Sequence, residues 1–388
     1  MTNLIIVYVL VVALIVAFIL TTYLVSHNHI MKYTDNWVKR FFAHPMLMYS
    51  IRRILSAFIS LLLTIIVTFF LLRIDDPRTV YCAGKWIKFS PQQQEFLCSL
   101  KLHRLGLDQN LFVQLIRYIY DILPFPKSIC VNEVTNSSGS AFICLTEKVT
   151  LINFGTSTSI SPGKQVVDFF TETMPWSLYI GLGGLVIEIF IGYPMGVMMA
   201  KYKNRWFDKL GNAYIILVGS IPGLVYYYIL QALFTEVFGL PIIWDRGNVI
   251  SWIPQMLTLG LGGVAGIALW VRRYMVDEFG ADYVKFARSK GVPENTILFK
   301  HVLRNAAVPL VRSIPAGVIY CLLGSYFVES IYNVEGFGDL LITSINRNDY
   351  PLTQAIVVVS AIISIIASLV GDITTAIADP RVSLTSKN

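Results

Sequence analysis

Long hydrophobic segments separated by short polar stretches dominate this chain. Each is long enough to cross about 30 Å of hydrocarbon as an α-helix. They lie at residues 3–26, 49–73, 174–200, 212–238, 251–271, 310–332 and 355–378. The segments contain glycine and proline, and none has the alternating polar and apolar positions of an outer-membrane barrel. The pattern predicts an all-α, multi-pass membrane protein.

Composition agrees with this prediction. Of the 388 residues, 55% are hydrophobic and only 14% are charged, and the mean hydropathy is +0.62. Soluble domains carry about 25% charged residues, so this chain has too little polar surface for water. The formal net charge of +7 reflects the topology discussed next, and no nucleic-acid partner is needed to explain it.

Lysine and arginine fall unevenly between the segments, and this bias predicts orientation, because cytoplasmic loops carry the excess of basic residues. The basic loops contain Lys32, Lys39, Arg40, Arg52 and Arg53, then Lys201, Lys203, Arg205 and Lys209, then Arg272, Arg273, Lys285, Arg288, Lys290, Lys300, Arg304 and Arg312. The loops 239–250 and 333–354 hold one basic residue each. The first set is therefore predicted to be cytoplasmic, in a plasma membrane.

The predicted organisation has six parts. An additional N-terminal helix at 1–27 begins without positive charge, so we expect a retained anchor with its N-terminus outside. A cytoplasmic linker at 28–48, a helix at 49–73 and an extracytoplasmic domain at 74–173 follow. A core of five transmembrane helices at 174–378 contains a cytoplasmic loop at 276–309, and a cytoplasmic tail at 379–388 ends the chain.

Four of the five cysteines, Cys82, Cys98, Cys130 and Cys144, lie in the predicted extracytoplasmic domain. An even number outside the membrane is typical of two disulfides. Three pairings are possible, and short loops favour Cys82 with Cys98 and Cys130 with Cys144. The alternative is four reduced, partly buried thiols. No close Cys-x-x-Cys pair is present, so a metal site is not predicted.

The cytoplasmic loop 276–309 has the pattern of two short amphipathic helices. Apolar residues recur at helical spacing over 276–290. Gly291 is expected to end that helix in the left-handed conformation, and Pro293 to occupy the first position of the next helix. Asn305 and Pro309 are expected to end the second helix. A cytoplasmic helical hairpin of this kind is typical of contact with a soluble partner.

The details of this loop resemble a known family. The residues that carry the likeness are Asp282-Tyr283-Val284, Ala287-Arg288, Lys290-Gly291, His301, Arg304-Asn305-Ala306 and Pro309. In this order they resemble the "EAA" loop of ATP-binding-cassette (ABC) importer permeases, in the form of the dipeptide and oligopeptide branch. Asp282 stands where many relatives have Glu, and Phe286 where a small polar residue is usual.

Further motifs extend the resemblance over about 49–118 and 150–381. They are Tyr49-Ser50-Ile51-Arg52-Arg53-Ile54, Asp76-Pro77, Leu105-Gly106-Leu107-Asp108, Phe154-Gly155-Thr156-Ser157, Val328-Glu329-Ser330-Ile331, Glu335-Gly336-Phe337-Gly338, Arg347-Asn348-Asp349-Tyr350-Pro351 and Asp379-Pro380-Arg381. Proline is usual at the position of Glu335. The span within 1–48 and the stretch 119–149 do not match, so their roles stay open.

The resemblance implies a type I ABC importer fold and the B-type permease subunit of a bacterial oligopeptide or dipeptide importer. It implies a second permease, two ATPase subunits that bind ATP and Mg²⁺, and an extracytoplasmic substrate-binding protein as partners. This chain has no G-x-x-x-x-G-K-[ST] loop, so we expect neither enzymatic activity nor a bound cofactor. The resemblance places ATPase coupling on Asp282, Ala287, Arg288 and Gly291. The cargo stays open.

Glu188 lies in the middle of an apolar segment, where a carboxylate is costly unless it faces water or the helix bundle. It could meet a peptide's amino group in the substrate pathway or be a hydrogen-bonded packing residue, and the sequence favours neither. The spacings Gly192-(x)3-Gly196 and Gly262-(x)3-Gly266 predict close helix packing. A secondary transporter and a receptor-like protein that uses its outer domain are the alternative functions. No internal repeat supports the first.

Overall fold

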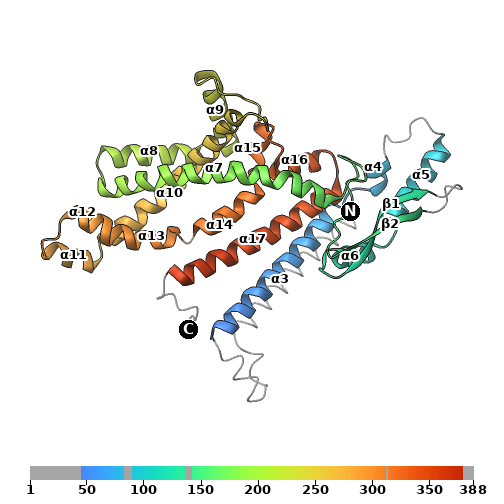
Figure 1. The fold of residues 1–388 in the computed structure, drawn as a ribbon, viewed down its shortest axis with the longest axis horizontal. Helices are drawn as coiled ribbons and strands as arrows, with labels where there is room; N and C mark the ends of the chain where they lie inside the picture. The colour runs from blue at the N-terminus through green and yellow to red at the C-terminus, as the bar shows by residue number, and fades with distance from the viewer. Residues whose placement is uncertain (1–44, 83–89, 136–141, 312, 379–388) are drawn as a thin grey trace, which may run out of the picture. The chain divides into compact units, whose positions relative to one another are not determined.

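The computed structural model describes residues 45–82, 90–135, 142–311 and 313–378 (Figure 1). The chain divides into two compact units, and each is described by itself. In the described ranges, the first unit contains 50–169 and 344–359, and the second contains mainly 170–343 and 360–378. The predicted N-terminal helix at 1–27, most of the linker and the tail lie outside the described residues.

The first unit contains a long helix, three short helices and a β-hairpin. These are α3 (Pro45–Leu71), α4 (Pro77–Cys82), α5 (Pro91–Arg104), α6 (Leu111–Ile122), β1 (Lys127–Thr135) and β2 (Phe142–Thr150). The start of α5 is well specified, since Ser90 and Gln93 form a reciprocal capping box ahead of Pro91. The side chains of Tyr81, Leu102 and Leu107 form a small core.

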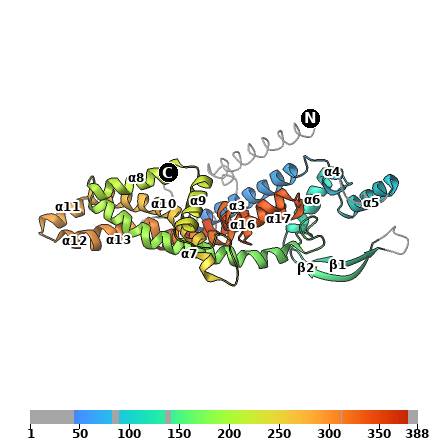
Figure 2. The same cartoon turned by 90° about the horizontal axis from the view of Figure 1, so that it is seen from above.

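The antiparallel hairpin of β1 and β2 (Figure 2) was not anticipated from the sequence. It occupies most of the stretch 119–149 that the resemblance leaves unmatched. Both strands are rich in Val, Ile and Thr, which fit a pleated surface. The predicted fold class holds, because the described residues are mostly helical, but the predicted domain at 74–173 also contains two strands.

The second unit is built almost entirely of helices. Its elements are α7 (Val166–Lys201), α8 (Trp206–Ser220), α9 (Gly223–Ala232), η2 (Leu233–Val237), η3 (Val249–Trp252), α10 (Ile253–Phe279), α11 (Asp282–Ser289), α12 (Glu294–Thr296), η4 (Ile297–Val302), α13 (Leu303–Val311), α14 (Ser313–Tyr320), η5 (Cys321–Leu323), α15 (Tyr326–Ile331) and α16 (Phe337–Asn346). Helix α17 (Tyr350–Ala378) is divided between the two units after Val359, and the first residues of α7 and the last residues of α16 belong to the first unit. Helix α7 begins at Val166 rather than at 174.

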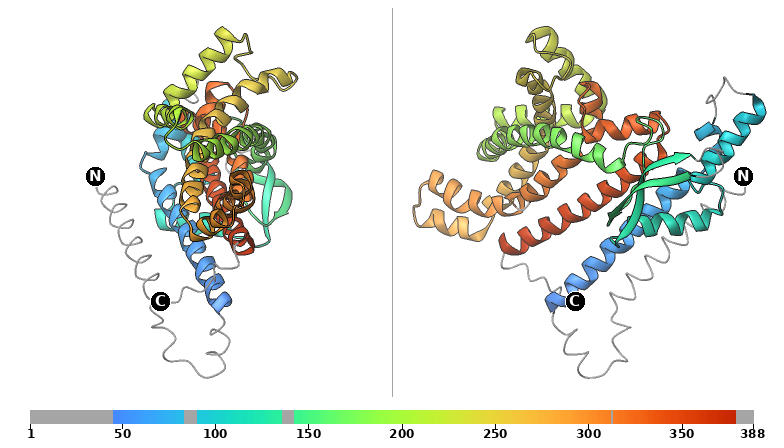
Figure 3. Two further views of the ribbon diagram at one scale, coloured as in Figure 1. Left: turned by 90° about the vertical axis from the view of Figure 1, so that its left-hand side faces the viewer. Right: turned by 45° about the vertical axis from the view of Figure 1, so that its right-hand side comes forward.

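Four described helical segments are long and apolar enough to cross a membrane: 166–201, 249–279, 313–331 and 350–374. Helices α8 and α9 together make a fifth, but they meet at an angle of 111° (Figure 3). The single helix expected at 212–238 is therefore divided into two bent helices, which together remain a candidate span. Pro222 lacks an N–H and disfavours a helical residue before it, and Ile221 is extended, with a ψ of 131°.

Helices α7 and α10 pack closely through small residues. A Cβ atom on Gly196 would lie 2.6 Å from the Cβ of Val271, and one on Gly192 would lie 3.0 Å from Ile267. The first predicted glycine spacing therefore lies at a helix contact. A Cβ on Gly266, by contrast, would meet nothing within 4 Å among the described residues, and one on Gly262 would make only ordinary contacts, at 3.8–3.9 Å, with Tyr226 and Tyr227.

Two further helix boundaries differ from the sequence prediction. The predicted segment 310–332 is interrupted at Gly324, which has a φ of +65°. Helix α13 continues through Asn305 and Pro309 to Val311, so these residues do not end it. Arg304 and Asn305 lie in the first turn of α13, and Pro309 lies inside the same helix. The packing of this segment in the hydrophobic core outweighs the local preference of these residues to end a helix.

Candidate functional site

The predicted hairpin is present, and its turn has a specific geometry. Helix α11 ends at Ser289, and Gly291 takes a φ of +73°. The Val292 N–H donates to the Ala287 carbonyl at 3.2 Å, and the Gly291 N–H donates to the Arg288 carbonyl at 2.9 Å. These two bonds form a Schellman motif, the common glycine-dependent end of a helix. Ala287 and Gly291 thus act together in one turn.

The start of the hairpin differs from the prediction. Residues 276–279 are the end of α10, and a break at Gly280 and Ala281 separates them from α11. Asp282 is the first residue of α11, where a negative charge favours the helix N-terminus. A hydrogen bond from Lys285 to this exposed carboxylate, 2.9 Å long, holds the pKa of Asp282 below its usual value.

The hairpin packs on α7 and α10 through a buried aliphatic face. Val284, Ile297, Leu298 and Val302 are 0–2% exposed and contact Val271 and Met275 of α10, together with residues at the end of α7. Across the turn, the Arg288 guanidinium binds the Glu294 carboxylate at 2.8 and 3.3 Å. The hairpin, α7 and α10 therefore share one hydrophobic core.

Three aromatic side chains of the hairpin remain exposed. Phe286 is 61% exposed, Phe299 58% and Tyr283 36%. The Lys290 ammonium lies 4.4 Å from the centre of the Phe286 ring. Large exposed aromatics beside basic groups are typical of the central contacts of protein interfaces. We call Tyr283, Phe286 and Phe299 the aromatic face.

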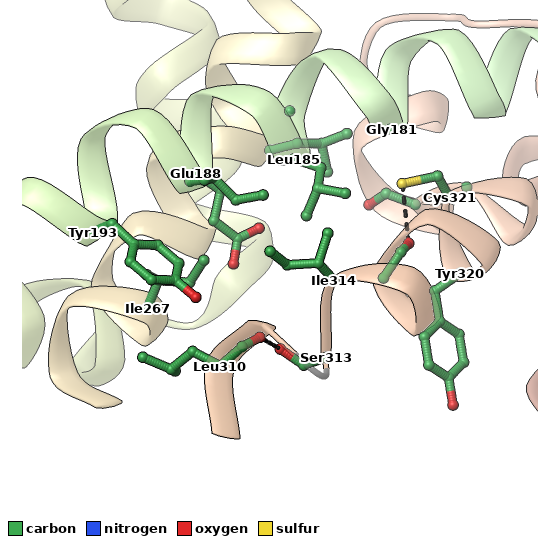
Figure 4. Close-up of a pocket in the computed structure, with 16 residues that line it drawn as sticks. Gly181, Leu185, Glu188, Tyr193, Ile267, Leu310, Ser313, Ile314, Tyr320 and Cys321 are labelled. Atoms are coloured by element: carbon green, nitrogen blue, oxygen red, sulfur yellow. Dashed lines mark hydrogen bonds between the residues drawn. The ribbon is translucent and has the colours of Figure 1, made fainter. Parts of the chain in front are cut away.

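Glu188 lines a pocket of about 370 Å³ within the second unit (Figure 4). Its carboxylate points into a space bordered by Leu185, Tyr193 and Ile314, with Cys321 further along the wall. Gly263 of α10 gives Glu188 room, because a Cβ atom there would overlap the carboxyl group. The Tyr193 hydroxyl is buried and has no hydrogen-bond partner among the described residues.

A second carboxylate, Glu329 of α15, lies in a cradle of backbone donors. It is 1% exposed and accepts the N–H groups of Ser325 (3.2 Å), Gly338 (2.8 Å) and Asp339 (3.1 Å). It therefore caps the N-terminus of α16. Cβ atoms on Gly324 or Gly336 would overlap its carboxylate. Two motifs quoted in the sequence analysis, 328–331 and 335–338, thus form one buried cluster.

A third carboxylate, Asp349, is completely buried in the first unit. The Ser157 hydroxyl donates to it at 2.5 Å, and the N–H groups of Thr158, Ser159 and Ile160 donate at 3.0–3.1 Å. Two further quoted motifs, 154–157 and 347–351, meet here. The bonds fix the loop before α7 to the residue that precedes α17.

The pair Asp208 and Arg272 was missed by sequence reasoning, which counted Arg272 only as a cytoplasmic charge. The guanidinium donates two bonds to the carboxylate, at 2.5 and 2.8 Å, and Asp208 is 2% exposed. The pair joins α8 to α10. The spacing between the two residues in the sequence contains no signal that would have linked them.

The cysteines are only partly described. Cys82 and Cys98 form a disulfide between α4 and α5, one of the pairings that the sequence left open. The side chains of Cys130 and Cys144 lie outside the described residues, and the strand register pairs their backbones with Glu147 and Glu133. Their disulfide stays a prediction. Among described residues, no group of three or more His, Cys, Asp or Glu side chains could hold a metal ion.

Comparison with known proteins places these features in a family. Residues 192–384 match "binding-protein-dependent transport system inner membrane component", and residues 46–140 match the N-terminal part of such membrane components. This chain belongs to that family of inner-membrane permeases. The first match begins just after Glu188 and contains the hairpin and the Glu329 cluster, and the second ends at residue 140, within the predicted domain at 74–173.

Individual relatives have names that agree with this assignment. The chain is 36% identical over 214 residues to the oligopeptide transport system permease protein AmiC of Streptococcus pneumoniae, a match that covers 54% of this chain and 43% of that protein. It is 28% identical over 339 residues to the dipeptide transport system permease protein DppB of Lactococcus lactis, covering 87% of this chain and 100% of that protein. The glutathione transport system permease protein GsiC of Salmonella paratyphi A is 29% identical over 343 residues, covering 87% of this chain and 99% of that protein. The match thus spans less than half of AmiC.

Proposed function

We propose that this permease is one of two transmembrane subunits of an ATP-driven importer of oligopeptides or dipeptides. The observation that carries the proposal is the hairpin, which buries its aliphatic side on α7 and α10 and exposes its aromatic face. A soluble ATPase would bind that face. ATP and Mg²⁺ would be held by the ATPase subunits, and an extracytoplasmic binding protein would deliver the cargo.

The packing of the hairpin supports a role in transmitting force. A displacement of α11 must move Val284, which is fully buried against the core that α10 and α7 share. Packed interiors deform little, so the displacement passes to the transmembrane helices rather than being absorbed. The Schellman turn and the Arg288–Glu294 pair hold α11 and α12 at one angle. Gly291 and Arg288 therefore keep the hairpin rigid.

The Glu188 pocket is the proposed part of the cargo pathway. Its lining is mainly apolar, with a carboxylate and a hydroxyl directed into it. A pocket with few polar groups fixes the orientation of a ligand through those groups. A peptide's amino group would bind Glu188, and the Tyr193 hydroxyl would take one of the remaining polar contacts.

Substitution of Gly291 tests the coupling role. Gly291→Pro fixes φ near −65° and removes the N–H that bonds to Arg288, so we expect insertion and assembly without substrate-stimulated ATPase activity or uptake. Gly291→Ala adds only the left-handed backbone strain, about 1–2 kcal/mol, because a Cβ there meets nothing within 4 Å. We expect partial coupling for this variant.

Gly239→Ala is the matched control, since Gly239 also has a positive φ of +66° and open space around it. Uptake of a labelled peptide and ATPase activity would be measured for all three variants in reconstituted complex. Normal coupling in Gly291→Pro would refute the proposed role. Copurification of ATPase subunits and a second permease with the wild-type chain tests the assembly.

Substitution of Glu188 tests the pathway. Glu188→Gln keeps the size of the side chain and removes its charge. We expect uptake of peptides with a free amino terminus to fall about tenfold, the loss of roughly one charge-assisted hydrogen bond, while N-acetylated peptides are transported equally by both proteins. An equal fall for both peptide classes would assign Glu188 to packing alone.

A further inference from the structure

A second pocket, of about 410 Å³, lies between the hairpin and the short turn that joins α7 to α8. Its polar lining comes from Lys201, Lys203 and Arg205 on that turn, and from Arg288 and Glu294 on the hairpin. Side chains from two separate segments therefore converge on one space. Neither the coupling role of the hairpin nor the peptide pathway uses this space.

The charge in this pocket is not balanced within the described part of the chain. Its one acidic lining residue, Glu294, is already paired with Arg288. Lys203 and Arg205 make no ion pair with a described carboxylate, and Lys201 donates only to the Asn295 amide oxygen, at 3.3 Å. The Arg205 guanidinium and the Lys201 ammonium also lie over the Tyr202 ring. Three cations thus line one pocket without a carboxylate partner among the described residues.

The position of the pocket points to the membrane surface. Lys201 is the last residue of α7, and Phe279 is the last residue of α10, and both helices are long and apolar enough to cross a membrane. The pocket therefore lies at the level where two spans end, on the side with the excess of basic residues. Ala200, Val276 and Leu298 add an apolar wall.

We propose that this pocket binds a phosphate group, carried by an anionic phospholipid of the cytoplasmic leaflet. Lys201, Lys203 and Arg205 would bind the phosphate oxygens through charge-assisted hydrogen bonds. The apolar wall would contact the glycerol and the first carbons of the acyl chains. Because the lipid would touch both the α7–α8 turn and the hairpin, its binding would stabilise the packed position of the hairpin.

Excess basic residues alone do not account for this arrangement. The bias toward positive cytoplasmic loops sets orientation without requiring any particular position in the fold. Lys209 and Lys300 satisfy the same bias, but they do not line this pocket. These two residues therefore provide a control with the same loss of charge.

The test uses the purified, assembled transporter in nanodiscs of zwitterionic phosphatidylcholine with increasing phosphatidylglycerol. Bound phosphatidylglycerol would be counted by native mass spectrometry. We expect the double variant K203Q/R205Q to retain it about 30-fold more weakly, since each basic side chain near an anionic surface contributes about fivefold. The control K209Q/K300Q should retain it as the wild type does, and melting temperatures would verify that both variants are folded.

Equal retention by K203Q/R205Q and the wild type would overturn the proposal, and so would an equal loss in K209Q/K300Q. A parallel arm adds inorganic phosphate to the detergent-solubilised complex and measures its melting temperature. Stabilisation by inorganic phosphate that requires Lys203 and Arg205, without lipid retention, would support phosphate recognition and overturn the lipid as its source.

Discussion

The hairpin and the buried carboxylates use charge in opposite ways. In the hairpin, Asp282, Arg288 and Glu294 are exposed and pair with one another or with neighbours a few residues away. Glu329 and Asp349, by contrast, are almost completely buried, and backbone N–H groups of loops far away in the sequence or of a following helix satisfy them. Surface ion pairs are weak, while a buried carboxylate that loses its donors is costly.

This difference distinguishes exposed charges, which are available to bind a partner, from buried charges, which hold the fold together. Hairpin charges can be exchanged at little cost to folding, because exposed ion pairs contribute little to stability. Each buried carboxylate holds two segments together, and we expect its loss to lower the stability of the fold.

Glu329→Ala should have the largest effect on stability. It removes the acceptor of three buried N–H groups, those of Ser325, Gly338 and Asp339, and each buried group left unpaired costs about 1–3 kcal/mol. We expect a loss of about 4 kcal/mol, seen as a lower melting temperature or lower accumulation in the membrane. Glu335→Gln is the control, because Glu335 is 64% exposed in its pair with Arg246. An equal loss in both variants would contradict the division.

Asp208→Asn should cause the next largest loss of stability. The substitution keeps the size of the side chain but leaves the partly buried Arg272 guanidinium without a charged partner. Breaking such a pair lowers the free energy of unfolding by about 3 kcal/mol, the low end of the usual range, because Arg272 is 22% exposed. Thermal unfolding of the purified complex measures the change, and Lys209→Gln on the same helix should leave it unaltered. A wild-type melting temperature for Asp208→Asn would show that the pair does not hold α8 to α10.

Phe286→Ala should change binding and leave stability unaltered. The ring is 61% exposed in this chain, so its removal takes little from the core. If the aromatic face binds the ATPase, truncation of a central aromatic should cost about 2 kcal/mol, or about 30-fold in affinity. Copurification at graded ATPase concentrations measures this. Phe58→Ala, which removes an aromatic that is 53% exposed on α3, is the control and should bind normally.

The smallest effect concerns pH and the Asp282–Lys285 pair. The pKa of Asp282 is lowered by its hydrogen bond from Lys285, so the pair favours folding above the ordinary carboxyl pKa. That contribution is lost as the pH falls through the lowered pKa. Coupling should therefore not depend on this pair between pH 5 and 9, because this range lies well above the ordinary aspartate pKa of about 3.9. Lys285→Gln should raise the pKa of Asp282 without a measurable change in melting temperature. A pH-dependent loss of coupling near neutrality in this variant would contradict the assignment.

Much of the fold was accessible to sequence reasoning because the physical causes are local. Hydrophobic segments that span the membrane, the basic loops and the glycine that ends α11 depend on residues close in sequence. The bend between α8 and α9 has a local cause in Pro222, yet hydropathy alone runs through it. The β-hairpin was missed because the stretch that contains it also lacked a match to the family.

The candidate site was accessible to a smaller extent. Gly291 could be assigned a turn from its neighbours, but its bonded partnership with Ala287 depends on the helix end that they form together. The cradle of Glu329 and the cradle of Asp349 each join motifs that the sequence shows separately. Nothing in the residue order states which carboxylate meets which glycine-rich loop.

The sequence by itself determined that this chain is a multi-pass membrane protein and predicted a basic helical hairpin, since periodicity, hydropathy and charge bias act over a few helical turns. Only the tertiary structure decided which charges are buried, which glycines make room for them, and where the cations of the α7–α8 turn converge. Those pairings join residues up to about 190 positions apart, and packing across such distances leaves no local pattern in the chain.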